Sequence, residues 1–339
     1  MASLYDTCAS IPNLLNPKAR VFLENVHMNW RVKAAIQNTL AKLPPAFGNP
    51  AYYWLQRRMG NMRRIDPTER VQAALDFCEM LEATGASPVD GRFLDLGTGW
   101  RVNIPIALWL CGARSVVTVD VNRYLKPALV RRDVRFMREH RARLESLLGA
   151  RLYQHRMDAL TQLDSRSWQI DDLFRLCSID YIAPGDAAQL PFESNSLDFE
   201  VSHMVLEHIP VAALQAIHRE AVRVLRPGGK VLHRIDLSDH FQHSDRTISP
   251  LNFLQFGDGE WSAIAGNRFM FMNRLRIDDY LRLIEEAGLR VVSCRRYEDE
   301  RGLEQLDGPS FHVDAQFSGK SRSDLATTAA WVVAEKPAS

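Results

Sequence analysis

Short apolar runs alternate with amphipathic segments through the central and C-terminal parts of the chain. The runs are rich in leucine, valine and isoleucine, as is typical of buried strands, and they cover residues 93–96, 115–120, 179–182, 196–203, 231–236, 289–297 and 328–335. Helical periodicity covers residues 102–111, 131–148, 211–225 and 277–287. The alternation predicts an α/β three-layer sandwich with helices on both faces of a mostly parallel, seven-stranded sheet.

Three other regions depart from this alternation. Residues 1–88 predict an N-terminal helical extension or cap, and residues 89–339 form the predicted main domain. Periodicity weakens over residues 149–177, which we interpret as an insertion because a plain connection would be shorter. A second insertion, residues 237–275, contains dispersed aromatic residues and follows the fifth strand, so we expect it to cover the substrate as a lid.

The first apolar run leads directly into a glycine turn, in the order Asp95-Leu96-Gly97-Thr98-Gly99. Glycines let a ligand lie against bare backbone, and Asp95 offers a carboxylate to a cationic group beside it. A dinucleotide fingerprint requires a third glycine where Val102 stands, and a pyrophosphate would be repelled by Asp95. The second strand ends in Asp120, which is suited to hold ribose hydroxyls. The turn therefore favours a positively charged nucleoside.

These features resemble the class I S-adenosylmethionine-dependent methyltransferases. The resemblance extends to Gly185-Asp186-Ala187 before Leu-Pro-Phe and to the Leu-Arg-Pro-Gly-Gly turn at 225–229. It implies a Rossmann-like sheet whose last strand is antiparallel, and S-adenosylmethionine as the cofactor. The cofactor-binding residues that it implies are Asp95, Gly97, Thr98, Gly99, Asp120, Asp186, Ala187 and His203. Asp186 would accept a hydrogen bond from the adenine amino group. A group of uncharacterised bacterial methyltransferases with Gly-Thr-Gly-Trp at 97–100 is also similar.

Histidines near two strand ends are candidates for the chemistry. If the acceptor is an alcohol, a base must remove its proton, and histidine suits that role near neutral pH. We predict His240 as the base, oriented by Asp236 or Asp239, with His208 as a further catalytic candidate. We predict no metal, although Asp236, Asp239, His240 and His243 offer oxygen and nitrogen ligands close together.

Composition narrows the class of protein. The chain has 339 residues, of which 46% are hydrophobic and 24% charged, with a net charge of +1, which argues against a dedicated nucleic-acid binder. No run is long enough to span a bilayer, and the start lacks the pattern of a secretory signal. Five scattered cysteines predict reduced thiols in a cytoplasmic protein.

The expected partner is a small molecule that receives a methyl group, with O-methylation preferred over N- or C-methylation. The aromatic and basic segment at 52–64 could close over an anionic substrate or touch a membrane surface, and the N-terminal helices could form a homodimer instead of a cap. Two alternatives remain: a regulatory or scaffold protein that binds S-adenosylmethionine without turnover, and an NAD oxidoreductase. Release of S-adenosylhomocysteine would separate the enzyme from the regulator.

Overall fold

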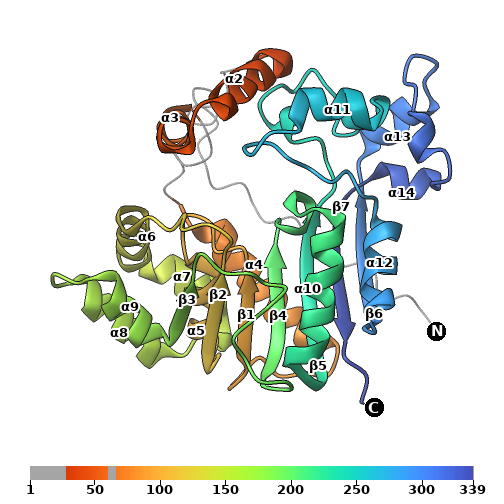
Figure 1. Cartoon of the computed structure of the whole chain (residues 1–339). Coiled ribbons are helices and arrows are strands. Elements are labelled where there is room, and N and C mark those ends of the chain that lie inside the picture. The colour runs from red at the N-terminus through yellow and green to blue at the C-terminus, as the bar shows by residue number, and fades with distance from the viewer. Residues whose placement is uncertain (1–27, 60–65, 339) are drawn as a thin grey trace.

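A seven-stranded mixed sheet forms the centre of the computed structural model, which describes residues 28–59 and 66–338 (Figure 1). The strands are β1 Arg92–Leu96, β2 Ser115–Val119, β3 Ile179–Ile182, β4 Leu197–His203, β5 Leu225–Asp236, β6 Arg290–Glu298 and β7 Thr327–Glu335. Their order is β3-β2-β1-β4-β5-β7-β6; β7 pairs antiparallel with both β5 and β6, and the other neighbouring strands pair in parallel. The predicted Rossmann-like fold is therefore confirmed, including the antiparallel last strand.

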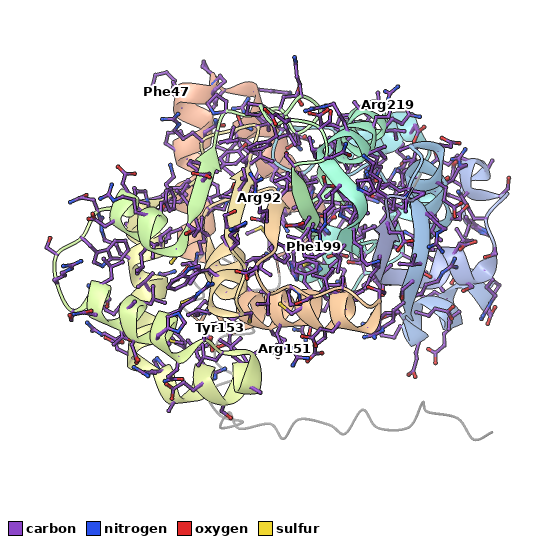
Figure 2. The ribbon with its side chains drawn as sticks, turned by 90° about the horizontal axis from the view of Figure 1, so that it is seen from below. Phe47, Arg92, Arg151, Tyr153, Phe199 and Arg219 are labelled. Atoms are coloured by element: carbon purple, nitrogen blue, oxygen red, sulfur yellow. The ribbon has the colours of Figure 1, made fainter. Side chains whose placement is uncertain are left out.

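Helices cover both faces of the sheet, and viewed from the amino ends of the strands the sheet lies between them (Figure 2). One face carries α4 Thr68–Ala83, α5 Asn103–Leu110, α6 Pro127–Glu139, α7 Arg141–Leu148, α8 Gln154–Asp164 and α9 Ile170–Cys177. The other face carries α10 Val211–Val224 and α12 Ile277–Glu286. Every residue of α5 is buried, because this helix packs between the sheet, α4 and α8.

Two predictions about this layer need correction. The predicted single helix at 131–148 is two helices, since the chain turns at His140 between α6 and α7. We predicted that this segment forms a solvent-exposed outer layer, but one face of α6, with Val130, Val134 and Met137, is buried. Residues 149–177, which we interpret as an insertion, contain a 3-10 turn, η2 Gly149–Arg151, followed by α8 and α9, which bury Leu160 and Leu173 in the main core.

The N-terminal helices do not form one unit. α4 lies within the predicted extension, yet it packs against the sheet through Val71, Phe77 and Leu81. In contrast, α2 Trp30–Lys42 and α3 Pro45–Met59 lie above the carboxyl ends of the strands (Figure 1). Residues 1–27 and 60–65 of the predicted extension lie outside the described residues.

A third hydrophobic core joins α2 to the 237–275 insertion. The insertion contains η4 His240–His243, η5 Asn252–Gln255 and α11 Asp258–Ala265. Trp30 of α2 lies 5.6 Å from Phe241, and Phe253 and Trp261 are buried in the same cluster. Phe241, Phe253 and Trp261 of the predicted lid pack into this core, because an insertion this far from the main core needs a core of its own.

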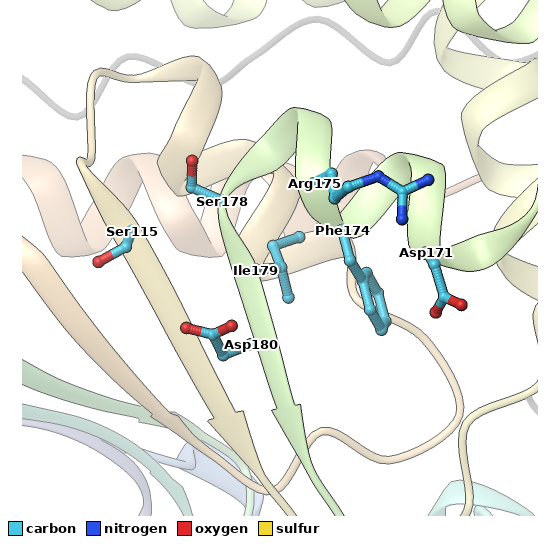
Figure 3. A pocket seen from close by; sticks show the side chains of 7 residues that line it. All are labelled: Ser115, Asp171, Phe174, Arg175, Ser178, Ile179 and Asp180. Atoms are coloured by element: carbon cyan, nitrogen blue, oxygen red, sulfur yellow. The ribbon is translucent and has the colours of Figure 1, made fainter.

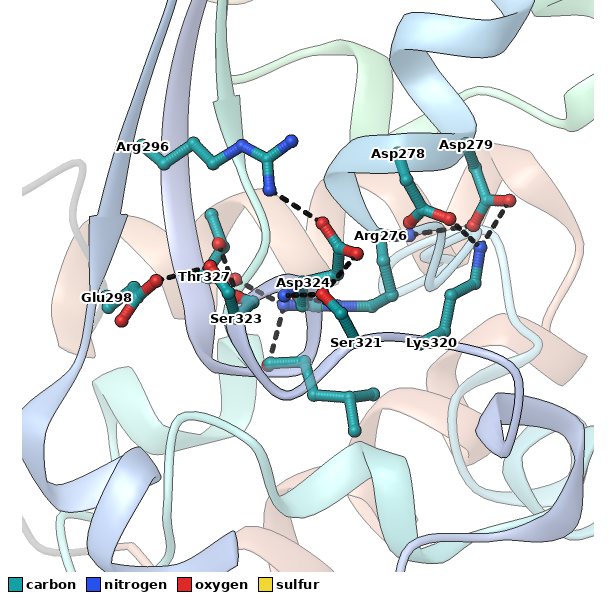
Figure 4. A network of polar contacts seen from close by, with 11 residues as sticks. Arg276, Asp278, Asp279, Arg296, Glu298, Lys320, Ser321, Ser323, Asp324 and Thr327 are labelled. Carbon is teal, nitrogen blue, oxygen red and sulfur yellow. Dashed lines mark hydrogen bonds and ion pairs between the residues drawn. The ribbon is translucent and has the colours of Figure 1, made fainter.

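The last connection, between β6 and β7, holds α13 Glu300–Asp307, η6 Ala315–Phe317 and α14 Arg322–Ala326. Arg276, fully buried before α12, ties this connection to the end of β5 (Figure 4). Its guanidinium donates to the carbonyl oxygens of Leu237 at 2.8 Å, Leu325 at 3.0 Å and Asp324 at 3.1 Å, and also to Thr327 O. One side chain thus satisfies four backbone acceptors where the insertion meets the sheet.

Among residues 28–59 and 66–338, no helix combines the length and apolar character that crossing a membrane requires.

Candidate active site

The glycine turn after β1 has the backbone that only glycine adopts easily. Gly97 has φ +80° and Gly99 has φ +61°. A Cβ on Gly97 would lie 2.6 Å from Val205 Cγ2, so a side chain is also excluded sterically. The Gly97 N–H donates to Val119 O at 2.8 Å, which fixes the turn to the end of β2. The backbone of this turn can therefore lie directly against a ligand.

Asp95 lies buried behind the turn. Its Oδ2 accepts a hydrogen bond from Thr118 Oγ1 at 2.8 Å, and Thr118 Oγ1 lies 2.6 Å from Thr98 Oγ1. Burial raises the pKa of Asp95 to about 7, although the bond from Thr118 and the charge of Arg70 oppose the rise. A cationic group beside Asp95 would favour its ionised form. Thr98 therefore supports Asp95 through Thr118.

Asp120 connects the glycine turn to the loop after β2. Its Oδ2 accepts from the Gly99 N–H at 2.9 Å, and its Oδ1 accepts from the Asn122 N–H at 2.9 Å. Each carboxylate oxygen keeps a second lone pair, so both oxygens can still accept from ribose hydroxyls. Burial raises the pKa of Asp120, and the two backbone bonds oppose this.

The predicted adenine segment lies beside Asp120. The Gly185 N–H donates to Asp120 O at 2.9 Å, and Asp186 Oδ1 accepts from the Ala188 N–H at 2.8 Å. Asp186 is exposed, and Ala187 packs at the edge of the core that underlies α10. The structure therefore brings the predicted cofactor stretches to one edge of the sheet, where they fit S-adenosylmethionine: carboxylates at each end and bare backbone between.

His203, at the end of β4, is buried and contacts Arg70. Burial lowers the pKa of His203 to about 3, and the charges of Arg70 and Arg234 add to this effect. A neutral His203 can accept from the Arg70 guanidinium. Sequence reasoning missed Arg70, because α4 brings it to the site from 133 residues away in the chain.

Asp236 and His240 lie together where β5 ends. Asp236 Oδ2 is 3.3 Å from His240 Nε2 and 3.8 Å from His243 Nε2. Burial alone would raise the pKa of Asp236, but His240 and the hydrogen bonds from Ser238 hold it well below its usual range. Asp236 is therefore a carboxylate, and it lies against a histidine that is 14% exposed.

Asp239, the other residue that we considered beside His240, has a different role. Its Oδ1 accepts from the Phe241 N–H at 2.8 Å and its Oδ2 accepts from Asn252 Nδ2 at 2.9 Å. Asp239 is fully buried and caps η4, so both oxygens are engaged within the insertion. Of the two aspartates, the structure therefore places Asp236 against the imidazole.

Glu207 is a buried carboxyl group that sequence reasoning did not assign. It lies in η3 Leu206–His208, and neither of its oxygens has a hydrogen-bond partner. Burial and the nearby Asp236 raise its pKa well above the usual range. His208 Nδ1 lies 2.8 Å from Phe271 O, so a neutral His208 donates from Nδ1 and presents Nε2. Burial lowers the pKa of His208 to about 4.

Glu207, His208 and His240 could together hold a metal ion, because one ligand atom from each lies within 4.8 Å of the others. His208 and His240 have ring centroids 4.9 Å apart. The metal group that we weighed from the sequence, which included Asp239, is a different set of residues. The signal for Glu207 in the sequence was an acid directly before His208 at the end of a buried strand.

Aromatic contacts join the cofactor turn to the segments above it. Trp100 stacks on Tyr53 of α3 at 5.0 Å and lies 5.2 Å from Tyr124. Tyr52, also in α3, stacks on Phe269 of the insertion at 4.2 Å. Neighbouring residues of α3 therefore contact the cofactor turn and the insertion.

A hollow of about 410 Å³ lies at the opposite edge of the sheet (Figure 3). It lies between the start of β2 at Ser115, the start of β3 at Ile179, and α9. Ligands of open α/β sheets bind at the carboxyl ends of the strands. This hollow is at the amino ends and contains none of the predicted site residues.

A methyltransferase domain family matches residues 155–233, which include Asp186, His203 and Glu207. None of the curated proteins matches the sequence closely enough to count as a relative.

Several solved structures resemble the chain at a distance. An S-adenosylmethionine-dependent methyltransferase from Methanosarcina mazei shares 16% identity over 73% of this chain and 93% of its own, with a TM-score of 0.39. Geranyl diphosphate C-methyltransferase from Streptomyces coelicolor A3(2) shares 14% identity over 79% and 77%, with a TM-score of 0.44. The [4+2]-cyclase SpnF shares 16% identity over 74% and 77%, with a TM-score of 0.40.

The strand order, the glycine turn and the matched segment define an α/β fold of the nucleoside-binding type with a methyltransferase domain.

Proposed function

We propose that the chain is an S-adenosylmethionine-dependent methyltransferase and that it methylates an oxygen atom of a small molecule, with His240 as the general base and Asp236 as the residue that orients it. The observation that supports this most is the 3.3 Å separation between His240 Nε2 and Asp236 Oδ2. An aspartate in this position fixes the imidazole ring and stabilises it once it has gained a proton. His240 Nδ1 is then the nitrogen that accepts the proton of the acceptor hydroxyl.

The reaction needs placement more than acid catalysis. When bound, S-adenosylmethionine supplies an electrophilic methyl group, and its sulfur leaves as a neutral thioether. Asp95, the turn at Gly97 and Asp120 hold the cofactor at the carboxyl edge of the sheet. The acceptor oxygen forms its new bond to the methyl carbon while its proton passes to His240, so charge and atoms balance.

The acceptor site is proposed to lie under a cap made of α2, α3 and residues 237–275. The stacking of Tyr52 on Phe269 and of Tyr53 on Trp100 supports this, because it joins the cap to the cofactor turn. Closure would exclude water from the reacting atoms. A net charge of +1 over the chain favours a small acceptor rather than a nucleic acid.

A second candidate has a specific observation in its favour. The carboxyl of Glu207 is buried without a partner and lies with His208 and His240 in the arrangement of a metal site. A divalent ion held there would bind the acceptor oxygen and lower its pKa, so that no histidine base is needed. His240 would then be a ligand rather than a base.

A screen of hydroxylated metabolites, read by release of S-adenosylhomocysteine, tests the proposal. With an acceptor in hand, we expect His240→Ala to lower kcat by about 10² to 10⁴ while the Kd for S-adenosylmethionine stays unchanged. His155→Ala, an exposed histidine on α8, is the matched control and should retain full activity.

Three outcomes would contradict the histidine-base proposal. Cofactor binding without product from any acceptor would favour the regulatory alternative. Activity that is lost on chelation and restored by a divalent cation would favour the metal-assisted route. Unchanged kcat in His240→Ala would place the base elsewhere.

A further inference from the structure

Three titratable side chains lie together inside the core on the α10 side of the sheet, away from the carboxyl edge. Glu200 comes from β4, His233 from β5 and His218 from α10. In the β4–β5 register, Ser202 pairs with His233 and Glu200 pairs with Val231, so Glu200, Ser202 and His233 share one face. His218 and His233 have no exposed surface, and Glu200 is 1% exposed.

Most of the polar atoms in this cluster lack a hydrogen-bond partner. His233 Nδ1 lies 2.8 Å from Ser202 Oγ, but His233 Nε2, both ring nitrogens of His218 and Glu200 Oε1 are unsatisfied. His233 Nε2 and Glu200 Oε1 are 3.8 Å apart, which is too far for a hydrogen bond. Buried polar atoms are normally paired, so four unpaired atoms in one place indicate a missing partner.

We propose that Glu200, His218 and His233 bind a divalent transition metal ion of the zinc class. Each residue offers one ligand atom, and these atoms lie within 4.8 Å of one another. Two imidazoles and one carboxylate suit zinc and its neighbours, whereas calcium and magnesium prefer oxygen ligands alone. A single ion satisfies an atom on all three side chains together.

Binding requires the ligand atoms to move closer together. Ligands about 2.0–2.1 Å from a tetrahedral zinc ion lie roughly 3.3 Å from each other, so the 3.8 Å pair must approach by about half an ångström, and a pair at the 4.8 Å limit by about 1.5 Å. The contact between Ser202 and His233 Nδ1 holds the ring with Nε2 toward Glu200, as groups behind metal-bound histidines commonly do. The second oxygen of Glu200 or a water molecule would fill the remaining position.

An ion here would be structural. It would join β4, β5 and α10. Glu200 lies in the same strand as His203, and His233 lies in the same strand as Asp236, so the ion would hold both strands that carry site residues. Because the cluster is enclosed, the ion would enter as the chain folds and exchange slowly afterwards. This site is separate from the proposed function, which stands or fails without it.

Metal analysis of the full-length protein tests the proposal. We expect about one zinc per chain after dialysis against a metal-free buffer, and a cobalt-substituted form with the visible absorption of a tetrahedral site. His218→Leu and His233→Leu should each lower the stoichiometry to below about 0.1 per chain. Glu207→Gln is the matched control, because it alters the other metal-like group and should keep the ion.

Two results would overturn the proposal. One is a folded wild-type chain that contains no metal and gains no cobalt absorption when refolded with the ion, which would assign the cluster to shared protons or buried water. The other is zinc that is lost in Glu207→Gln but retained in His218→Leu. If the leucine variants fail to fold, Glu200→Gln and the wild-type cobalt spectrum give the same decision.

Discussion

Replacing Gly97 by alanine tests the geometry of the cofactor turn quantitatively. Gly97 has φ +80°, and an alanine held in a left-handed conformation costs about 1 kcal/mol. Its new Cβ would also lie 2.6 Å from Val205 Cγ2 and 2.8 Å from Cγ1, and overpacking of this kind costs about 1–3 kcal/mol. We therefore expect Gly97→Ala to lower the free energy of unfolding by about 2–4 kcal/mol.

The chain provides a control for each part of this sum. Gly85 has φ +78°, and a Cβ added there would meet nothing within 4 Å, so Gly85→Ala should cost only the backbone part, about 1 kcal/mol. Adding Val205→Ala to Gly97→Ala should remove the overlap, and a double-mutant cycle measures that coupling. The assay is urea unfolding of the four variants and the wild type, with calorimetric titration of S-adenosylmethionine.

The cofactor titration should show weaker binding in Gly97→Ala and unchanged binding in Gly85→Ala, since only the turn at Gly97 lies at the site. The reasoning is refuted if Gly97→Ala loses no more stability than Gly85→Ala, or if the cycle shows no coupling to Val205.

Two further predictions follow from buried charges. Burial raises the pKa of Asp95 to about 7, so between about pH 4 and 7 the carboxyl of Asp95 is protonated in the folded chain and ionised in the unfolded chain. The free energy of unfolding should therefore fall as the pH rises from about 4 to 7. A cationic cofactor binds the ionised form of Asp95, so the affinity for the cofactor should rise by up to about tenfold per pH unit below pH 7. Asp95→Asn should abolish this pH dependence, and a wild-type affinity that does not change with pH would contradict the role of Asp95 in cofactor binding. Arg276→Met leaves four carbonyl oxygens without their donor and should lower the free energy of unfolding by at least about 3 kcal/mol. The control Arg282→Met replaces a side chain that is 63% exposed and should lower it by less than about 1 kcal/mol. Equal losses in urea unfolding would count against the network in Figure 4.

Much of the sheet was predictable because its signals are local. A buried run that ends in Asp95 and a glycine turn specifies strand, turn and helix over a few residues. The parallel arrangement then brings Asp120 and Asp186 to the same edge, so the cofactor side could be proposed from the order of motifs alone.

The acceptor side could not be predicted in the same way, since it depends on contacts between distant segments. Asp236 and Asp239 are equivalent in the sequence, and only the path of the chain through η4 turns one toward His240 and the other into a cap. Arg70 reaches His203 from α4, and Trp30 and Ala34 complete a core whose remaining members lie more than 200 residues away. Polar residues within apolar strands, such as Glu200, were the overlooked signal for the buried cluster.

The most direct test of the account is a crystal structure of the enzyme with S-adenosylhomocysteine. We expect the amino group of the ligand beside Asp95, its ribose hydroxyls on Asp120, its adenine beside Asp186, and its sulfur facing the space in front of His240. A nucleoside bound at another edge of the sheet, or one whose sulfur faces away from the Asp236–His240 pair, would contradict it.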